Sequence, residues 1–389
     1  MKITDIKTII LKYPYESFIA DGQSACFGRG ALLIQVETDA KITGLGECAT
    51  FGASMTAMAD IIENQLKGLL IGQNPLDIER LWETMVWSNF ANGRRGIVMG
   101  AISGIDIALW DIAGKVAGLP LYRLLGANSD KVKGYASAGF YAPEKSIDDL
   151  KREMESYMAK GYTAFKMKVG RSRNNIGMPH RYVNKGDFNI SFEEDMARVA
   201  AVRETIGQDA VLMIDMNCTW DVDAVLAAEK YFDEYNIYWI EEPSRSDDVA
   251  GYAKIAAGLK RTKVAGCESE QGLARYKELL ERGALDVVQA NLGWSGGFTE
   301  CRRIAALSLA YDKLFTPHTF FSAVLTNVHF ASSLPNVPFI ESEENYNPLR
   351  TELLKEPIQC DSEMNYLVPQ GAGLGVELNM DVVEKYRVR

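Results

Sequence analysis

The alternation of hydrophobic and polar residues changes its rhythm near residue 126. Before that point, strand-like patterns come first and three longer segments with helical periodicity follow. Strands followed by a run of helices are typical of an α+β unit, so we predict one over residues 1–125. The expected elements are strands at about 2–11, 30–38 and 42–47 and helices at about 54–70, 75–90 and 97–117.

Short apolar segments recur at regular spacing through the rest of the chain, with helical patterns between them. Eight strands alternating with seven helices indicate an α/β unit whose parallel sheet closes into a barrel. Capping boxes at Ser146 with Asp149 and at Ser191 with Glu194 begin two of the helices. The expected strands are Val132–Tyr141, Ala164–Gly170, Val211–Asn217, Ile237–Pro243, Lys263–Ser269, Asp286–Leu292, Leu314–Phe320 and Pro338–Glu344, and the helices include Ile147–Ala159 and Ala224–Tyr235.

Acidic residues outnumber basic ones, 52 to 42, which gives the 389-residue chain a net charge of −10. A surface of that sign repels phosphate backbones and anionic lipid, so we expect neither nucleic acid nor membrane as a partner. The 47% hydrophobic and 24% charged content excludes a disordered or fibrous chain. Because the glycine-rich motifs GxGxxG and GxxxxGK[ST] are missing from their usual places, a phosphate-cradling loop has no support.

The chain is expected to be cytoplasmic. Its first residues alternate like a strand and carry no apolar signal-peptide core. The most apolar stretch, 97–118, is interrupted by Asp106 and Asp111, so we expect no membrane span. Six cysteines are scattered without a CxxC pair, which indicates reduced thiols.

Three consecutive barrel strands are each expected to end at a carboxylate: Asp215, Glu241 and Glu268. The carboxyl ends of parallel strands meet at one end of a barrel, so these side chains should converge. Converging carboxylates repel one another unless a cation lies between them, and an all-oxygen set suits Mg²⁺. We therefore predict a magnesium site, the alternative being solvated loop carboxylates or helix caps.

The second barrel strand carries Lys166 and Lys168 at a period of two, so both should point into the barrel. Two ammonium groups beside a metal lower each other's pKa, which lets one act as a base near neutral pH. A register shifted by one residue would turn both lysines outward instead. His318 at the end of strand seven and Glu341 on strand eight are further candidates.

Together, Lys-x-Lys, Asp-x-Asn, Glu-Glu-Pro, a glutamate on the next strand and a late histidine resemble the mandelate racemase group of the enolase superfamily. The resemblance covers nearly the whole chain, including the sequence GIDIALWDIAG at 104–114 and GAGLGVE at 371–377. It implies a modified TIM barrel, (β/α)7β, over 126–365 with an N-terminal α+β capping domain over 1–125, which the C-terminal residues at about 366–389 join.

The same resemblance assigns roles to the candidate residues. Asp215, Glu241 and Glu268 match the ligands of one Mg²⁺, Lys168 the proton-abstracting base, and Lys166 the neighbour that lowers its pKa and stabilises charge on the substrate. Cap loops near 15–30 and 48–56 are expected to close over the barrel, and the family implies homo-oligomers. The remaining matches are Glu341 to the acid that hydrogen-bonds the substrate carboxylate, His318 to the second catalytic group, and Asn217 to a polar neighbour that binds substrate.

One position departs from the family pattern. The family places an aspartate five residues before Gly296, paired with the histidine, and this chain has Asn291 there. Asparagine can accept a hydrogen bond from the imidazole, but it cannot supply the negative charge that stabilises an imidazolium. We therefore expect His318 to stay largely neutral, and the chemistry to depend mainly on Lys168 rather than on two bases.

The resemblance implies Mg-dependent removal of the proton α to the carboxylate of a sugar acid (an aldonate or aldarate), which gives an enediolate. Loss of a β-hydroxyl as water would make an acid-sugar dehydratase, the activity expected first. If the leaving group is instead the ring oxygen of a sugar-acid lactone such as galactarolactone, the enzyme is a cycloisomerase. The stretches 286–300 and Tyr346–Arg350 resemble the sequences of such cycloisomerases. Reprotonation of the other face would make a racemase or epimerase. Outside enzymes, an inactive barrel with a binding role is the alternative.

An irregular insertion, 171–190, separates the second barrel strand from its helix. Insertions at the carboxyl ends of barrel strands usually lie over the active site. With Arg173, His180, Arg181 and Lys185, this one is expected to cover the bound ligand and attract its negative charge. A loop far from the chemistry is the alternative.

Overall fold

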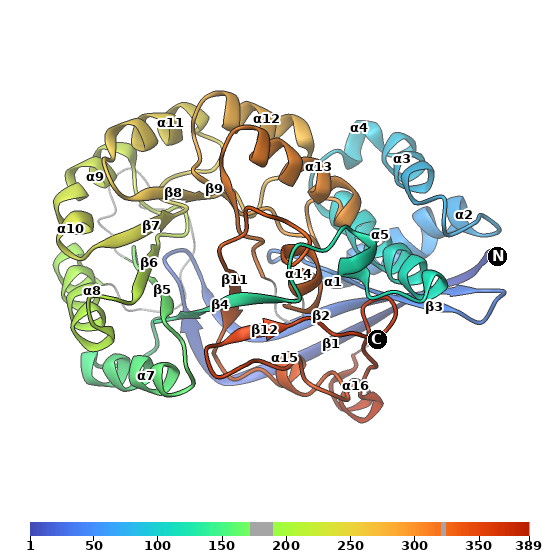
Figure 1. Cartoon of the computed structure of the whole chain (residues 1–389), viewed down its shortest axis with the longest axis horizontal. Helices are drawn as coiled ribbons and strands as arrows, with labels where there is room; N and C mark the ends of the chain where they lie inside the picture. The colour runs from blue at the N-terminus through green and yellow to red at the C-terminus, as the bar shows by residue number, and fades with distance from the viewer. Residues whose placement is uncertain (172–189, 320–323, 389) are drawn as a thin grey trace.

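The computed structural model describes residues 1–171, 190–319 and 324–388, and it contains two main sheets (Figure 1). The first is antiparallel, in the order β1-β2-β3. In Figure 1 it crosses the molecule in blue beside the helices α1 to α5. Its strands are β1 (Ile3–Ala20), β2 (Ala25–Thr38) and β3 (Thr43–Cys48).

The β1–β2 hairpin is much longer than predicted. Strand β1 continues past residue 11 to Ala20, and the register between the strands shifts between Pro14 and Ile19. Proline has no backbone N–H to pair with the neighbouring strand and is tolerated at such irregular positions, which is why the pattern there did not predict a strand. The extension carries the hairpin tip onto the barrel, where Ala20 and Tyr141 exchange backbone hydrogen bonds of 2.7 and 2.8 Å.

Helix α5 (Ile97–Ala117) packs on β3 and forms the core of the N-terminal part. The contact is close because β3 has glycine at 44 and 46, and a Cβ at Gly46 would lie 2.0 Å from the carbonyl oxygen of Gly104 on α5. The other helices here are α1 (Met55–Ile61), a π-helical turn (Ile62–Leu66), α2 (Lys67–Leu70), α3 (Ile78–Ser88), α4 (Phe90–Gly93) and α6 (Leu121–Leu124).

By length and composition alone, α5 is long and apolar enough to cross a membrane. However, 83% of its most apolar window is buried inside the protein, as in the core helix of a globular domain. Its two aspartates, Asp106 and Asp111, are fully buried. No other helix in the described part of the chain meets the same test.

The second sheet contains the predicted barrel. Its order is β10-β9-β8-β7-β6-β5-β4-β11, so the last barrel strand pairs with the first, and one or two helices follow each of the first seven strands. This is the predicted (β/α)7β arrangement, and the helices form an arc around the strands in Figure 1. The strands are β4 (Lys131–Ala138), β5 (Ala164–Lys168), β6 (Val211–Asp215), β7 (Ile237–Glu241), β8 (Lys263–Gly266), β9 (Val287–Val288), β10 (Leu314–Phe315) and β11 (Ile340–Glu343).

The barrel helices confirm both predicted capping boxes, at Ser146 with Asp149 and at Ser191 with Glu194. The predicted strands, by contrast, run one to five residues past the observed carboxyl ends, and at three of them residues with positive φ turn the backbone out of the sheet there. The helices are α7 (Ile147–Ala159), α8 (Phe192–Ile206), α9 (Val222–Ala227), α10 (Glu229–Glu234), α11 (Val249–Gly258), α12 (Leu273–Glu281), α13 (Gly297–Ala310) and α14 (Val324–Ala331).

After the barrel the chain returns to the N-terminal sheet. Strand β12 (Asn365–Leu367) pairs with β4, and Val388 donates a hydrogen bond to the carbonyl oxygen of Ile10 on β1. The short helices α15 (Pro348–Thr351) and α16 (Met380–Tyr386) lie on this path. All six cysteines are free, four of them buried, as predicted for reduced thiols.

Candidate active site

The carboxyl ends of β6, β7 and β8 place the three predicted carboxylates. Asp215 and Glu241 are the last residues of β6 and β7, and Glu268 lies two residues past β8. Within three residues of the end of each of these strands the backbone enters the left-handed region, which turns the chain away from the sheet. The residues with positive φ are Asn217 (44°), Cys218 (61°), Glu242 (42°) and Cys267 (66°).

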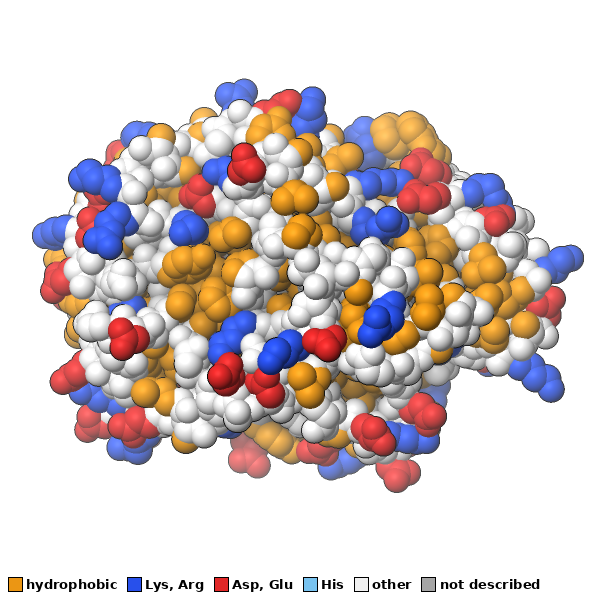
Figure 2. Space-filling view, viewed as in Figure 1, with side chains coloured by type: hydrophobic (Ala, Val, Ile, Leu, Met, Phe, Trp, Pro, Cys, Tyr) orange, Lys and Arg blue, Asp and Glu red, His pale blue; other side chains and the backbone are white. Residues whose placement is uncertain are grey.

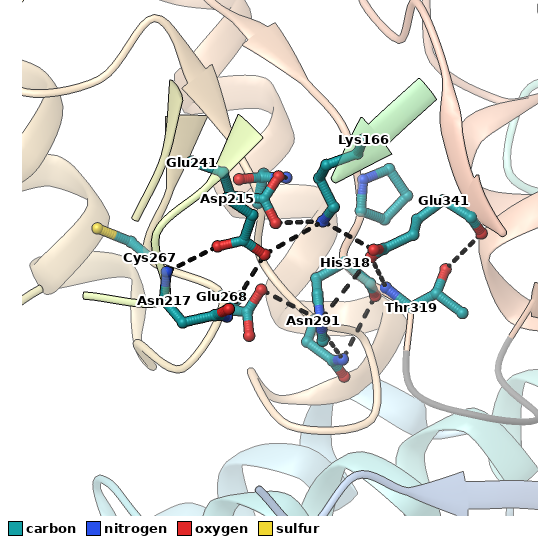
Figure 3. A network of polar contacts seen from close by, with 12 residues as sticks. Lys166, Asp215, Asn217, Glu241, Cys267, Glu268, Asn291, His318, Thr319 and Glu341 are labelled. Atoms are coloured by element: carbon teal, nitrogen blue, oxygen red, sulfur yellow. Dashed lines mark hydrogen bonds and ion pairs between the residues drawn. The ribbon is translucent and has the colours of Figure 1, made fainter. Parts of the chain in front are cut away.

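Lys166 on β5 lies at the centre of the site (Figure 3). Its side chain is 1% exposed, and its ammonium contacts Glu241 and lies 2.7 Å from Glu341 and 3.7 Å from Asp215. These carboxylates raise the pKa of Lys166 well above its ordinary value, against burial, which lowers it. The lysine is therefore a fixed positive charge, and both lysines point into the barrel as the predicted register requires.

Lys168 is an ion-pair partner of Asp215. Burial and the Lys166 charge lower the pKa of Lys168, but Asp215, Glu241 and Glu341 together raise it above its ordinary value. The expectation of a lowered pKa included a bound metal ion beside the two lysines, so it stays a prediction for the metal-bound site. Asn217 binds Asp215 from the other side, through its backbone N–H at 2.9 Å.

The donor chemistry of the site suits a divalent cation. Burial raises the pKa of Glu241 to about 7 despite the opposing Lys166, and burial together with the charges of Glu242 and Asp215 holds the pKa of Glu268 well above its usual range. The pKa values of these buried carboxylates are raised even with the two lysines beside them. An additional positive charge, such as a divalent cation, would therefore stabilise their ionised form. Among the described residues, no group of three or more His, Cys, Asp or Glu side chains is already arranged to hold a metal ion.

His318 lies three residues past the end of β10 and lines the cavity. Its Nε2 is 3.1 Å from Glu268 and 3.8 Å from Glu341, and its Nδ1 is 2.9 Å from Nδ2 of Asn291. The same amide nitrogen lies 3.3 Å from the carbonyl oxygen of His318. An amide NH₂ only donates, so Nδ1 accepts and the ring proton is on Nε2. The expectation that Asn291 accepts a hydrogen bond from the ring is therefore wrong, because the nearby carbonyl turns the NH₂ group toward the histidine.

The N-terminal part covers this histidine. The Phe51 ring lies 5.5 Å from the His318 ring and 5.3 Å from the Trp294 ring, measured between centroids. The pKa of His318 is lowered to about 4, mainly by burial. The charges of Lys166 and Lys168 also lower it, and the charge of Glu341 opposes them. The imidazole is thus neutral, as predicted from the missing aspartate, although burial is the larger cause.

Glu341 on β11 joins the two halves of the network. Besides Lys166 and His318, it accepts a hydrogen bond of 3.2 Å from the backbone N–H of Thr319. Lys166 and the neighbouring lysine hold the pKa of Glu341 below its ordinary value, against burial, so this carboxylate is ionised. All nine predicted site residues therefore lie in one connected network: Lys166, Lys168, Asp215, Asn217, Glu241, Glu268, Asn291, His318 and Glu341.

A cavity of about 1040 Å³ opens over this network. The barrel supplies its floor, including Lys168, Glu268 and His318, and the expected loops of the N-terminal part supply its roof, with residues 21–30 of the hairpin and 50–55. Arg171 fastens the hairpin turn by donating to the carbonyl oxygens of Asp21 and Ser24. The prediction that the 171–190 insertion covers the ligand concerns residues 172–189, which lie outside the described residues.

Sequence reasoning missed several residues at the site. Glu343 follows Glu341 at the strand period of two, a signal that was available, and it forms an ion pair with Arg29 at 2.8 Å. Gln289 precedes Asn291 at the same period and donates to Glu241 at 2.8 Å. Arg29 had no signal, because its position over the barrel follows from the unpredicted length of the hairpin.

Outside the cavity, charges of both signs are interspersed over the face that Figure 2 shows, with no large area of one sign. The net charge of −10 is therefore not gathered into one acidic patch on this face. The buried cluster at the barrel mouth is the charge arrangement that calls for a chemical explanation.

Comparison with known proteins agrees with the fold. Residues 149–382 match the family described as enolase C-terminal domain-like, and residues 27–126 match the mandelate racemase / muconate lactonizing enzyme N-terminal domain. Among relatives, arabinonate dehydratase of Saccharolobus solfataricus is 32% identical over 91% of this chain and 90% of its own length. D-galactarolactone cycloisomerase of Agrobacterium fabrum is 31% identical over 100% and 99%.

Among solved structures, a racemase from Streptomyces coelicolor with bound magnesium has a TM-score of 0.88 and 29% identity, covering 99% of this chain and 100% of its own. Its fold extends over both the N-terminal part and the barrel, so the likeness is not confined to one of them. The relatives are lyases and isomerases that act on acid sugars or their lactones. This chain is an enzyme of the enolase superfamily, in the mandelate racemase and muconate lactonizing group.

Proposed function

We propose that this enzyme removes the proton α to the carboxylate of a sugar acid and eliminates the β-hydroxyl as water, as an acid-sugar dehydratase. The observation that supports this best is the buried pair Lys166 and Lys168 among the carboxylates at the barrel mouth. One ammonium is embedded among three carboxylates, whereas the other lines the cavity and can reach a substrate.

Asp215, Glu241 and Glu268 would hold one Mg²⁺. When bound, the ion supplies positive charge for both oxygens of the substrate carboxylate as the α-proton leaves. The same carboxylates that raise the pKa of Lys168 would then share their charge with the ion, which favours the free amine that a base needs. Gln289 and Trp239 donate to Glu241 and orient it, at 2.8 and 3.2 Å.

The chain's own residues account for every proton in this elimination. Nζ of Lys168 takes the α-proton and returns it to the departing hydroxyl oxygen, so water leaves and the lysine is regenerated. The enol that remains loses its hydroxyl proton and gains one at C3, which gives the 2-keto-3-deoxy acid. Removal of the α-proton turns the substrate carboxylate into an enediolate, and Lys166 stabilises the negative charge that develops on it. Glu341 forms a hydrogen bond with the same carboxylate. His318 donates a hydrogen bond from Nε2 to the departing oxygen and remains neutral.

The second candidate is a cycloisomerase, in which the leaving group is a ring oxygen of a sugar-acid lactone. The 31% identity with D-galactarolactone cycloisomerase over the entire chain favours it, and the first step is the same. A racemase or epimerase would need a base on the opposite face. His318 carries its proton on Nε2 and so cannot accept one there, which disfavours that reaction.

The wider organisation is part of the proposal. Residues 1–125 with 366–389 would form the cap and residues 126–365 the catalytic barrel. The six free cysteines favour a reducing compartment such as the cytoplasm. We also expect a homo-oligomer, and no nucleic-acid or membrane partner.

Proton exchange tests the proposal. The enzyme with Mg²⁺ in deuterated buffer is incubated with a library of aldonic acids, aldaric acids and their lactones, and NMR follows loss of the α-proton signal. We expect exchange with at least one compound, accompanied by a 2-keto-3-deoxy product for a dehydratase or an opened lactone for a cycloisomerase. No exchange with any compound would contradict the proposed function.

A further inference from the structure

The lining of the cavity contains a second buried ion pair, between the hairpin and the last barrel strand. Nη2 of Arg29 lies 2.8 Å from Oε1 of Glu343, and their side chains are 5% and 12% exposed. Arg29 also contacts Cys26 and lies over the Tyr15 ring at 5.4 Å. Both members of the pair line the same cavity as Lys168 and His318.

Strand β11 places Glu343 relative to Glu341, which lies in the network of the two lysines. Glu341 and Glu343 are two residues apart and so face the same side of the strand, roughly 6.6 Å apart along it. Glu341 contacts Lys166, whereas Glu343 meets the hairpin. A substrate whose carboxylate lies at the lysines would therefore extend its other end toward Glu343 and Arg29.

The charges at this end are already balanced. Three cations line the cavity within the described residues, and each has an acidic partner: Arg29 with Glu343, Arg245 with Asp247, and Lys168 with Asp215. The acidic lining residues are more numerous: Asp21, Glu242, Asp247, Glu268, Glu341 and Glu343. A second substrate carboxylate placed here would meet the carboxylate of Glu343 rather than an uncommitted cation.

Glu343 is instead arranged to bind a hydroxyl group. Its Oε1 accepts from Arg29 and, at 3.1 Å, from Nδ2 of Asn345. Within the described part of the chain no hydrogen bond ends on Oε2, which leaves that oxygen to accept from a substrate. Carboxylates accept from hydroxyl groups and repel other carboxylates, so the pair selects by attraction and repulsion at once.

We propose that the Arg29–Glu343 pair makes this enzyme specific for substrates with a single free carboxylate, aldonates or lactones, over dicarboxylic aldarates. The inference rests on the proposed function and narrows its substrate class. Glu343 is the residue that would touch the hydroxyl end, and Arg29 holds its carboxylate in place through Oε1. A lactone qualifies because ring closure hides one of the two acid groups.

The test compares an aldonate with the aldarate of the same configuration, which differ only at the far carbon. The wild-type enzyme should prefer the aldonate in kcat/KM by at least about tenfold, roughly one hydrogen bond to a charged group. Glu343→Gln removes the repulsion and releases Arg29, so the ratio should shift toward the aldarate by about tenfold or more. For the aldonate, Glu343→Gln should raise KM and leave kcat nearly unchanged, since the two lysines are not altered.

Two further variants make the outcome decisive. Glu343→Asp keeps the charge and should keep the aldonate preference even if it weakens binding. Glu344→Gln makes the same charge change one residue further on, in a network with Lys160 and Tyr162 outside the cavity, and should leave the ratio unchanged. A wild-type preference for aldarates, or an equal loss on both acids in Glu343→Gln, would overturn the inference. Absence of α-proton exchange on every acid would instead contradict the proposed function.

Discussion

The mouth of the barrel and the joint, by which we mean the surface of α5 that packs against β3, α13 and the C-terminal segment, both bury carboxylates, but they satisfy them differently. At the joint, Asp111 accepts from the backbone N–H groups of Leu45 and Leu374 at 2.8 and 2.7 Å, and Lys115 is its one side-chain partner among the described residues, at 2.7 Å. Asp106 accepts from the backbone N–H of Thr299 at 3.0 Å and from its hydroxyl. At the mouth, Glu241 and Glu268 are bound by side chains: Lys166, Gln289, Trp239 and His318.

This difference separates structural from functional burial of charge. Backbone donors are fixed by the fold and cannot be exchanged, so a carboxylate bound to them contributes to stability. Side chains can move or share their partners with a cation or a substrate, so carboxylates held by them can take part in a reaction. Variants at the mouth should therefore change turnover, and variants at the joint should change stability.

The largest effect is expected from the carboxylates of the mouth. Glu241→Gln, or exhaustive chelation, should remove nearly all activity while the protein stays folded, because a bound cation supplies several kcal/mol of charge stabilisation. Asp111→Asn at the joint is the matched control, and it should lower the thermal midpoint but retain turnover. Turnover and circular dichroism measure the two properties, and full activity after chelation would break the comparison.

Lys168→Ala should reduce α-proton exchange on the order of 10³-fold or more, because general base catalysis alone contributes about 10² to 10⁴. NMR in deuterated buffer measures the exchange. Lys115→Ala removes a lysine that binds Asp111 at the joint and should leave exchange unchanged. Unimpaired exchange in Lys168→Ala would assign the base to another residue.

His318→Asn should retain α-proton exchange and slow the later elimination step by about tenfold to hundredfold, the worth of one hydrogen bond to a group gaining charge. Asn291→Asp should raise the pKa of His318 from about 4, because a carboxylate would favour the imidazolium. NMR titration of the ring measures this shift. Loss of exchange in His318→Asn, with exchange intact in Lys168→Ala, would reverse the two roles.

The smallest effect concerns the pH dependence of stability at the joint. Burial raises the pKa of Asp106 to about 7 from 3.8, against the hydrogen bonds from Thr299. The folded state then holds a proton that the unfolded state has lost, so stability should fall as pH rises from about 4 to about 7. The slope from this one group is at most about 1.4 kcal/mol per pH unit.

Asp106→Asn should remove that slope, and chemical unfolding at several pH values measures it. The turnover of this variant should match the wild type at a pH where both are folded. A slope unchanged by the substitution would show that Asp106 is ionised in the folded protein.

Much of the fold and the site could be predicted from the sequence because strand ends and periods of two are local features. The starts of most barrel strands, both capping boxes and the inward lysines of β5 follow from a few neighbouring residues. The glycines in the sequence TGLGEC of β3, in contrast, can be explained only with α5 in place. A Cβ at Gly44 or Gly46 would collide with the backbone of the helix that packs on them.

What could not be predicted depends on contacts between distant segments. The extended hairpin is held by pairing with Tyr141, more than a hundred residues away in the chain, and it places Arg29 beside Glu343. The orientation of the Asn291 amide depends on the carbonyl of His318. The raised pKa of Lys168 depends on three carboxylates from different strands, which a reading of β5 alone leaves out.

The pairing of β4 with β11 has a consequence for biosynthesis. As the chain leaves the ribosome, β4 emerges early, and its partner on one side, Ile340–Glu343, emerges about two hundred residues later. Until then that edge of the growing sheet has no native partner and can pair with another nascent chain. We expect soluble yield to rise when translation is slowed or chaperones are abundant, because a barrel of this topology closes only near the end of synthesis.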